Sequence, residues 1–348
     1  MAESFPDFTP VNLITGFLGS GKTTLLSRLL RQPELAGAAV LINEFGEVGL
    51  DHHLLEVVDE NIVLLQSGCL CCTIRGDLSD AMRSLHSRRS RGEVPPFDRL
   101  LVESTGLADP YPILSTIRAD PVLTHHFRCG NVIVTIDAVN GPAQLARHGE
   151  SLRQVAAADR LVITKTDLCD EAAVAAMKAR LRGLNPLAPI AVAGDRIDAA
   201  GLGLSGREEA GFGRLAEPPA LQPHGHDHGH DHGHHHHDTE AAGIRSFVVT
   251  MDQPMDWTAF GIWLTMLLNR HGDNILRVKG ILNLAGEKRP VAVHGVQRLV
   301  HPPVHMKRWP DADRRSRIVF IVQDLDPDLI RRSLAAFNRI SLTETVTT

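Results

Sequence analysis

A glycine-rich run that ends in a lysine and two threonines begins at residue 16, and its spacing follows the pattern G-x-x-x-x-G-K-[ST]. In such a loop the backbone N–H groups turn inward around phosphate oxygens. Lys22 would reach the β and γ phosphates, and the hydroxyl of Thr23 would ligate Mg²⁺. The alternative is a chance glycine-rich turn. The pattern predicts nucleotide contacts from Gly16, Gly19, Ser20, Gly21, Lys22, Thr23 and Thr24.

An acidic residue follows an apolar run further along the chain, in LLVESTG at residues 100–106. A carboxylate at the end of a strand can hold Mg²⁺ or its water beside a phosphate-binding loop, and open α/β sheets bind their ligands at this edge. Glu103 is therefore the candidate, and with Lys22 and Thr23 it forms the predicted catalytic set. A strand-end glutamate that only pairs with a lysine is the alternative.

A later apolar run is followed by TKTD at residues 164–167. There Asp167 would accept both the N1 proton and the exocyclic amine of guanine, whereas adenine offers no matching pair of donors. The segment therefore favours guanine nucleotides, with an ordinary loop as the alternative. Thr164 stands where the usual Asn-Lys-x-Asp pattern has asparagine, so one contact to the base or to a loop differs from that pattern. The predicted base-binding residues are Thr164, Lys165 and Asp167.

Three of the five cysteines are crowded into GCLCCT at residues 68–73. An extended chain would point Cys69 and Cys71 to one face and Cys72 to the other, but a turn at Gly68 allows the three sulfurs to converge. Converged thiolates bind soft or borderline ions such as Zn²⁺, and three of them leave one tetrahedral position open for another ligand or a receiving protein. Buried free cysteines, a regulatory disulfide and three ligands of an iron–sulfur cluster are the alternatives.

Two further segments carry possible metal ligands. The first, NEFGEVGLD at residues 43–51, contains Glu44, Glu47 and Asp51, which would serve either the Mg²⁺ of the nucleotide or the ion held by the cysteines. A solvated acidic loop is the alternative. The second, residues 224–237, holds nine of the 19 histidines and no apolar residue. It predicts a disordered linker that collects Zn²⁺, Co²⁺ or Ni²⁺ weakly, or else a plain spacer.

The apolar pattern shows which elements would position these residues. Runs without period-2 alternation indicate strands buried on both faces, and they alternate with segments of helical spacing. The predicted strands are 11–14, 38–42, 62–65, 100–102, 132–136, 161–163 and 190–192, and the predicted helices include 23–30, 78–85 and 172–181. Repeated βα units predict an α/β fold with a doubly wound, mostly parallel sheet, and the glycine-rich motif at residues 16–24 makes this the fold of a P-loop NTPase.

A different pattern follows the histidines. We expect strands at 244–250, 275–284, 291–293 and 318–322 and helices at 257–268 and 327–337, which together form a smaller α+β domain. Residues from 241 onward carry 15 Lys and Arg against 10 Asp and Glu, although the whole chain has a net charge of −5. The predicted division is a nucleotide domain at 1–215, a histidine-rich linker at 216–240 and a C-terminal domain at 241–348.

The composition argues against several classes of protein. With 36 Lys and Arg against 41 Asp and Glu, the chain has no overall positive charge, so neither nucleic acid nor a membrane is an expected partner. The first ten residues contain no Lys or Arg and no long apolar core, and no stretch reaches about 18 apolar residues, so we expect no secretory signal and no membrane span. The crowded cysteines indicate a reducing compartment, and we expect a cytoplasmic protein.

The order of these motifs resembles that of the CobW family of P-loop GTPases. The motifs are GFLGSGKTT at 16–24, NEFG at 43–46, GCLCC at 68–72, ESTG at 103–106 and TKTD at 164–167, with ILRVKG at 275–280 and HPPVH at 301–305 near the C-terminus. That family includes zinc-transferring chaperones, the cobalamin-biosynthesis protein CobW and nitrile hydratase activators. The resemblance implies that Cys69, Cys71 and Cys72 ligate metal, that Lys22 and Thr23 handle phosphate and Mg²⁺, and that Asp167 reads guanine.

The leading prediction is a GTP-hydrolysing metallochaperone. It would bind Zn²⁺, or else Co²⁺ or Ni²⁺, at the three cysteines with Glu44 as a further metal ligand, and hydrolysis would drive delivery of the ion to a client metalloprotein. The expected cofactors are GTP or GDP, Mg²⁺ and Zn²⁺, and the prediction allows a homodimer. The alternative is a cytosolic metal buffer or sensor with vestigial GTPase activity. An ATP-using kinase or synthetase is a second rival, against which Asp167 argues.

Overall fold

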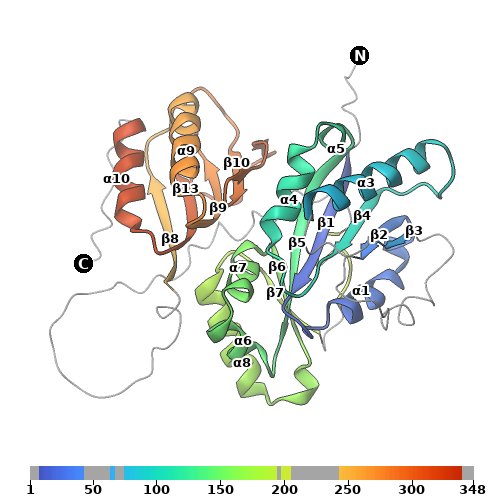
Figure 1. The fold of residues 1–348 in the computed structure, drawn as a ribbon. Helices are drawn as coiled ribbons and strands as arrows, with labels where there is room; N and C mark the ends of the chain where they lie inside the picture. The colour runs from blue at the N-terminus through green and yellow to red at the C-terminus, as the bar shows by residue number, and fades with distance from the viewer. Residues whose placement is uncertain (1–7, 43–62, 67–73, 194–196, 205–242, 339–348) are drawn as a thin grey trace. The chain divides into compact units, whose positions relative to one another are not determined.

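The computed structural model describes residues 8–42, 63–66, 74–193, 197–204 and 243–338 (Figure 1). The chain divides into two compact units, the larger built from Met1–Ala179 and Ala188–Gly211 and the smaller from Arg180–Leu187 and Phe212–Thr348. The predicted domain limits at 215 and 241, and the predicted linker between them, lie outside the described residues.

A parallel sheet forms the centre of the larger unit, and its strand order in the described part of the chain is β3-β2-β4-β1-β5-β6-β7. The strands are β1 (Thr9–Gly16), β2 (Ala38–Ile42), β3 (Val63–Gln66), β4 (Arg99–Glu103), β5 (Phe127–Asp137), β6 (Arg160–Thr164) and β7 (Ile190–Val192). Each predicted strand of this unit is confirmed. A strand covered on both faces has no solvent side, so its sequence is a continuous apolar run.

Helices cover both faces of this sheet. One helix, α1 (Lys22–Leu30), joins β1 to β2, and it packs against Ile14 of β1 and Val40 of β2. The helices α3 (Ile74–Ser90), α4 (Pro110–Ala119), α7 (Gly149–Ala157) and α8 (Glu171–Leu184) join strands that advance in the opposite direction across the sheet. Because crossovers between parallel strands are right-handed, these four lie on the face opposite α1. The doubly wound α/β prediction is therefore confirmed (Figure 1).

The sequence patterns did not name α4 or α7, and they also missed three shorter helices in the described part of this unit. These three are η1 (Pro33–Leu35), α5 (Pro121–His126) and α6 (Gly141–Arg147). Each begins with a proline in its first turn, where the missing N–H costs nothing.

An antiparallel sheet forms the smaller unit, in the order β11-β10-β9-β13-β8, with β12 paired to β10. Its strands are β8 (Ile244–Met251), β9 (Ile275–Leu282), β10 (Val291–Val296), β11 (Leu299–Val300), β12 (Val304–His305) and β13 (Ser316–Gln323). The helices α9 (Trp257–His271) and α10 (Pro327–Asn338) pack on one face, where Trp263 and Ile330 meet Phe320. The predicted α+β architecture is confirmed, although β11 and β12 were too short to be predicted.

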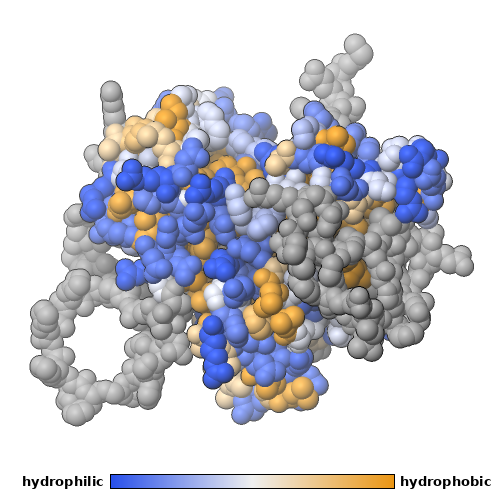
Figure 2. Space-filling view, in the orientation of Figure 1, coloured by the Kyte–Doolittle hydropathy of each residue, from blue (hydrophilic) through white to orange (hydrophobic). Residues whose placement is uncertain are grey.

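On the face shown in Figure 2, orange hydrophobic residues occur in small groups among blue hydrophilic ones. Within the described residues, no helix is both long enough and apolar enough to cross a membrane.

Candidate functional site

The glycine-rich loop lies where the sequence pattern predicts, between the end of β1 at Gly16 and the start of α1 at Lys22. Gly21 is the N-cap of α1 and has a left-handed backbone with φ of 86°. At Gly16, where φ is 142°, a Cβ atom would lie 2.4 Å from the carbonyl oxygen of Thr135. Glycine is needed at both positions, and the resulting turn directs the N-terminus of α1 to the carboxyl edge of the sheet, where its N–H groups can bind an anion.

Hydroxyl groups from two other strands hold this loop in place. The hydroxyls of Ser20 and Thr135 lie 2.6 Å apart, and Thr164 Oγ1 donates to the carbonyl oxygen of Ser20 at 2.7 Å. All three residues are buried. Thr164, which replaces the usual asparagine, therefore contacts the glycine-rich loop. The sequence patterns had not identified Thr135.

Thr23 and Glu103 are brought together although they are 80 positions apart in the sequence. The Thr23 hydroxyl, at the start of α1, donates to Oε1 of Glu103, at the end of β4, over 2.6 Å. The glutamate is buried, with 3% of its surface exposed. A hydroxyl and a carboxylate are the hard oxygen donors that Mg²⁺ prefers, so this pair fits the predicted ion. Lys22 Nζ donates to the carbonyl oxygen of Phe17 at 3.3 Å, while Thr24 is exposed.

The predicted base-binding segment follows β6 and forms a short turn, η2 (Thr166–Leu168). Lys165 has a positive φ of 56°, and its Nζ donates to Oδ2 of Asp137 at 2.7 Å. Asp167 is exposed, so its carboxylate is open to a ligand from solvent. Beside this turn lies a cavity of about 500 Å³ that is lined by Thr166, Cys169, Glu171, Val174, Ala175, Lys178 and Val192.

Asp137 anchors this segment, and the sequence patterns had not identified it. Its carboxylate is 1% exposed at the end of β5 and accepts hydrogen bonds from the backbone N–H groups of Val139 and Asn140. Burial alone would raise the pKa of Asp137, but the hydrogen bonds from Lys165 and Asn140 outweigh it, so the pKa lies below its ordinary value. Like Glu103, this aspartate ends an apolar strand, which is the signal that could have revealed it.

The predicted metal ligands Cys69, Cys71, Cys72 and Glu44 lie outside the described residues, as do the histidines between 224 and 237. Within the described part of the chain, no group of three or more His, Cys, Asp or Glu side chains is arranged to hold a metal ion. Cys129 and Cys169 are free thiols. Desolvation of the half-buried Cys129 raises the pKa of its thiol to about 12, so it stays protonated at neutral pH.

Comparison with known proteins decides the family. Residues 10–192 match the model of the CobW/HypB/UreG nucleotide-binding domain, which is more than half of the chain. The chain belongs to the CobW/HypB/UreG family. Residues 244–338 match the C-terminal domain of the cobalamin synthesis protein cobW, so the resemblance seen in the sequence is confirmed for both units of this family member.

Two relatives in this family are similar over nearly their whole length. The zinc chaperone YjiA of Escherichia coli (strain K12) is 35% identical over 330 residues, which are 94% of this chain and 98% of that protein. The zinc chaperone CobW of Pseudomonas aeruginosa is 31% identical over 363 residues, 93% of this chain and 90% of that one. The crystal structure of Zn(II)-bound YjiA GTPase from E. coli matches with a TM-score of 0.70 and 31% identity, covering 95% of this chain and 99% of that chain.

Proposed function

We propose that this protein is a GTPase metallochaperone that couples its nucleotide state to the delivery of a metal ion, Zn²⁺ or else Co²⁺ or Ni²⁺, to a client metalloprotein. The observation that carries the proposal is the Thr23–Glu103 pair at the mouth of the glycine-rich loop, because it supplies oxygen ligands for Mg²⁺ beside a phosphate site. The names of the relatives, zinc chaperone and Zn(II)-bound GTPase, support the zinc part of the proposal.

The site residues lie at the carboxyl edge of the parallel sheet, which we call the nucleotide edge, and each has a proposed role. The glycine-rich loop from Gly16 to Thr24 binds the phosphates, and Lys22 neutralises their charge. Thr23 and Glu103 would hold Mg²⁺, which supplies charge stabilisation on the β and γ phosphates. Thr164 holds the glycine-rich loop in place by donating its hydroxyl to the carbonyl oxygen of Ser20. Lys165 and Asp167 contact guanine, with Asp137 keeping Lys165 in place.

The metal cargo is proposed to bind at Cys69, Cys71 and Cys72. Thiolates bind Zn²⁺ well, and an ion held by three of them keeps one position for a ligand from the client. Glu44 is a further candidate ligand. We place the cargo site in a GTPase domain spanning 1–215, joined through a histidine-rich linker at 216–240 to a C-terminal domain at 241–348.

The decisive experiment measures zinc affinity in two nucleotide states. Protein lacking residues 225–237 is loaded with GDP or with a non-hydrolysable GTP analogue, and Zn²⁺ is titrated against a competing chelator. A chaperone that releases its ion requires different affinities in the two states, typically by about 5-fold to 150-fold. By linkage, Zn²⁺ must change the affinity for the analogue relative to GDP by the same factor.

Two cysteine variants show whether the effect comes from the proposed site. Cys71→Ala should weaken zinc binding in both states. Cys129→Ala is the matched control, because a thiol with a pKa of about 12 is a poor metal ligand at neutral pH, and it should leave zinc affinity unchanged. Equal affinity in the two nucleotide states would favour the alternative, a metal buffer or sensor. Unchanged affinity in Cys71→Ala would place the cargo elsewhere.

A further inference from the structure

The loop that follows β4 lies directly against the glycine-rich loop. Ser104 donates its backbone N–H to the carbonyl oxygen of Ile14 in β1 at 3.0 Å, so the loop leaves the sheet beside β1. Two residues later, a Cβ atom on Gly106 would lie 2.6 Å from the backbone nitrogen of Leu18 and 2.7 Å from its Cα atom. The two loops therefore touch backbone to backbone, and only glycine permits this distance.

One side chain from α7 holds this loop in position. Gln154 Nε2 donates to the carbonyl oxygen of Gly106 at 3.2 Å and to that of Ala108 at 3.0 Å. Carbonyl oxygens only accept hydrogen bonds, so the amide nitrogen must face them and the orientation of the amide is settled by chemistry. The side chain is buried, with only 1% of the residue exposed. Both of its N–H groups are thus used on the same short segment.

The neighbouring residue of α7 makes a second attachment further along the loop. Arg153 Nε lies 3.2 Å from Oδ2 of Asp109, and Asp109 Oδ1 accepts from the backbone N–H of Tyr111 to cap α4. The arginine pair is partly exposed, so it contributes less than about 1 kcal/mol. Of these two attachments, the buried amide of Gln154 is therefore the stronger.

The position of this loop matters for the proposed GTPase. GTP and GDP differ only in the γ-phosphate, and Mg²⁺ bridges β and γ oxygens in P-loop enzymes. Glu103, the proposed Mg²⁺ ligand, directly precedes the loop, and Leu18 belongs to the proposed phosphate-binding loop. A segment that touches both is placed to respond to the presence of a γ-phosphate.

We propose that Gln154 is a positioning residue that keeps the Gly106–Ala108 segment against the glycine-rich loop and thereby sets the ratio of the affinities of this protein for GTP and GDP. This inference rests on the proposed nucleotide site, and it assigns to α7 a role that no sequence motif indicates. Gln154 acts through the loop backbone and does not itself touch the nucleotide.

The test replaces Gln154 with methionine, which is similar in length but has no N–H to donate. Affinities for GDP and for a non-hydrolysable GTP analogue are measured by fluorescence titration of the full chain, with kcat and KM for GTP measured separately. We expect the affinity for the analogue to fall about tenfold, as for the loss of one to two hydrogen bonds, and kcat to fall with it. The affinity for GDP should stay within about twofold of the parent value.

Gln32→Met is the matched control. The Gln32 side chain also bonds backbone groups within the larger unit, donating to the carbonyl oxygen of Ile197 at 2.8 Å and accepting from the N–H of Ala199 at 2.9 Å. It lies after the C-terminal end of α1, away from the glycine-rich loop. This variant should lower the melting temperature but leave the ratio of the two affinities at the parent value.

Several results would overturn the inference. A Gln154→Met protein with the parent ratio of analogue to GDP affinity would do so, whether both affinities fell equally or neither changed. If that variant fails to fold by circular dichroism, Gly106→Ala replaces it, since a methyl group there must push the loop away from Leu18; an unchanged ratio would again refute the role. Should the parent protein itself bind no GTP, the proposed function fails instead, so the two failures are distinguishable.

Discussion

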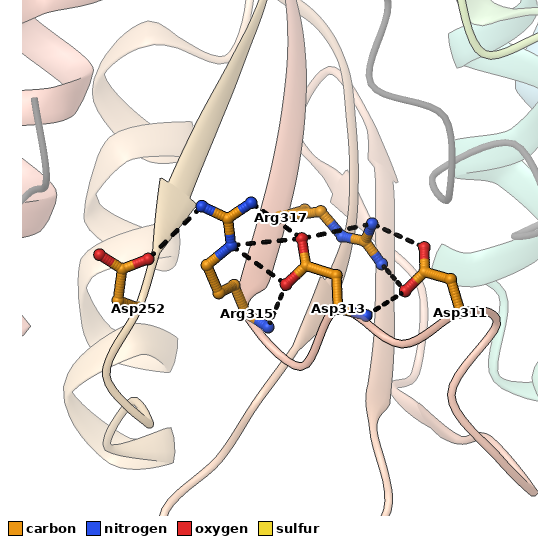
Figure 3. A network of polar contacts seen from close by, with 5 residues as sticks. All are labelled: Asp252, Asp311, Asp313, Arg315 and Arg317. Carbon is orange, nitrogen blue, oxygen red and sulfur yellow. Dashed lines mark hydrogen bonds and ion pairs between the residues drawn. The ribbon is translucent and has the colours of Figure 1, made fainter. Parts of the chain in front are cut away.

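Each unit contains a cluster of interacting polar side chains, and the two clusters are assembled differently. At the nucleotide edge of the parallel sheet, Ser20, Thr23, Glu103, Thr135 and Thr164 come from the glycine-rich loop, from α1 and from three strands. In the smaller unit, the arginine cluster consists of Asp311, Asp313, Arg315 and Arg317 from one short segment, with Asp252 just after β8 (Figure 3).

In the arginine cluster, each charged side chain forms an ion pair with another member of the cluster. Arg317 is buried and makes a two-pronged contact with Asp311, at 2.8 Å and 3.1 Å. Arg315 Nη2 lies 3.0 Å from Oδ2 of Asp313, and Arg315 Nη1 lies 3.6 Å from Oδ1 of Asp252. The hydrogen bond from Arg315 lowers the pKa of Asp313, so that carboxylate is ionised at neutral pH. Such a group of mutually paired charges holds a turn onto the sheet.

The nucleotide edge is built mainly from neutral hydroxyl groups, whose hydrogen bonds tie separate segments together. Its charged members, Lys22 and Glu103, stand at the loop where a phosphate and a cation would bind. Charged groups beside a loop that can bind an anion indicate a binding site, whereas charges that pair with one another, as in the arginine cluster, indicate a structural role. The comparison therefore predicts that a change at the nucleotide edge lowers GTP hydrolysis or nucleotide binding. A change in the arginine cluster should instead lower stability and leave hydrolysis unchanged.

The largest effect is expected at the nucleotide edge. Lys22→Ala should reduce Mg²⁺-dependent GTP hydrolysis to background, because the charge on the β and γ phosphates loses its counter-charge. Phosphate release from GTP is measured with and without ATP as a competitor. We expect the parent protein to turn over slowly, below about one per second without a partner protein, and ATP to compete little. Lys288→Ala, an exposed lysine in the smaller unit, is the control. Hydrolysis by Lys22→Ala at the parent rate would refute the assignment of this site.

The next largest effect concerns stability and should leave hydrolysis unchanged. Arg317→Met removes the buried partner of an ion pair whose other member, Asp311, is partly exposed. We expect the free energy of unfolding to fall by about 2 to 4 kcal/mol, near the lower end for buried pairs because of this exposure. Thermal unfolding followed by circular dichroism measures it. Arg314→Met is the control from the same segment, where an exposed guanidinium lies 5.4 Å from the ring of Trp309. A loss of GTP hydrolysis in folded Arg317→Met protein would contradict the structural role.

The smallest effect separates the contribution of the Thr164 hydroxyl group from that of its methyl group. Thr164→Val keeps the methyl group near Gly21 but loses the hydroxyl that donates to Ser20, so GDP should bind about fivefold more weakly, as for one lost hydrogen bond. Thr164→Ser keeps the hydroxyl and should bind GDP within about twofold of the parent. Titration with a fluorescent GDP analogue measures both. Equal affinity in the valine variant would show that the hydroxyl does not support the loop.

Local patterns were sufficient to predict most of the fold. The apolar runs identified every strand of the parallel sheet, and the spacing of Gly16, Gly21 and Lys22 identified the loop after β1. The missed helices α4 and α5 each begin with an aspartate cap followed by proline, at Asp109 and Asp120, which is a start signal that sequence reasoning could have used. The apolar residues of α4, Ile113, Leu114 and Ile117, also follow helical spacing, whereas α5 spans six residues and buries only Leu123, too few to show a period.

By itself, the sequence determined which elements form and which residue types stand at their ends, because hydrophobic period, glycine content and helix caps act over a few neighbouring residues. The tertiary structure alone decided which of these ends meet. Thr23 contacts Glu103, Lys165 contacts Asp137, and the Gln154 amide holds the Gly106 carbonyl 48 positions away. Those pairings follow from strand order and right-handed crossovers, which bring distant segments to the same edge of one sheet and leave no local mark in the sequence.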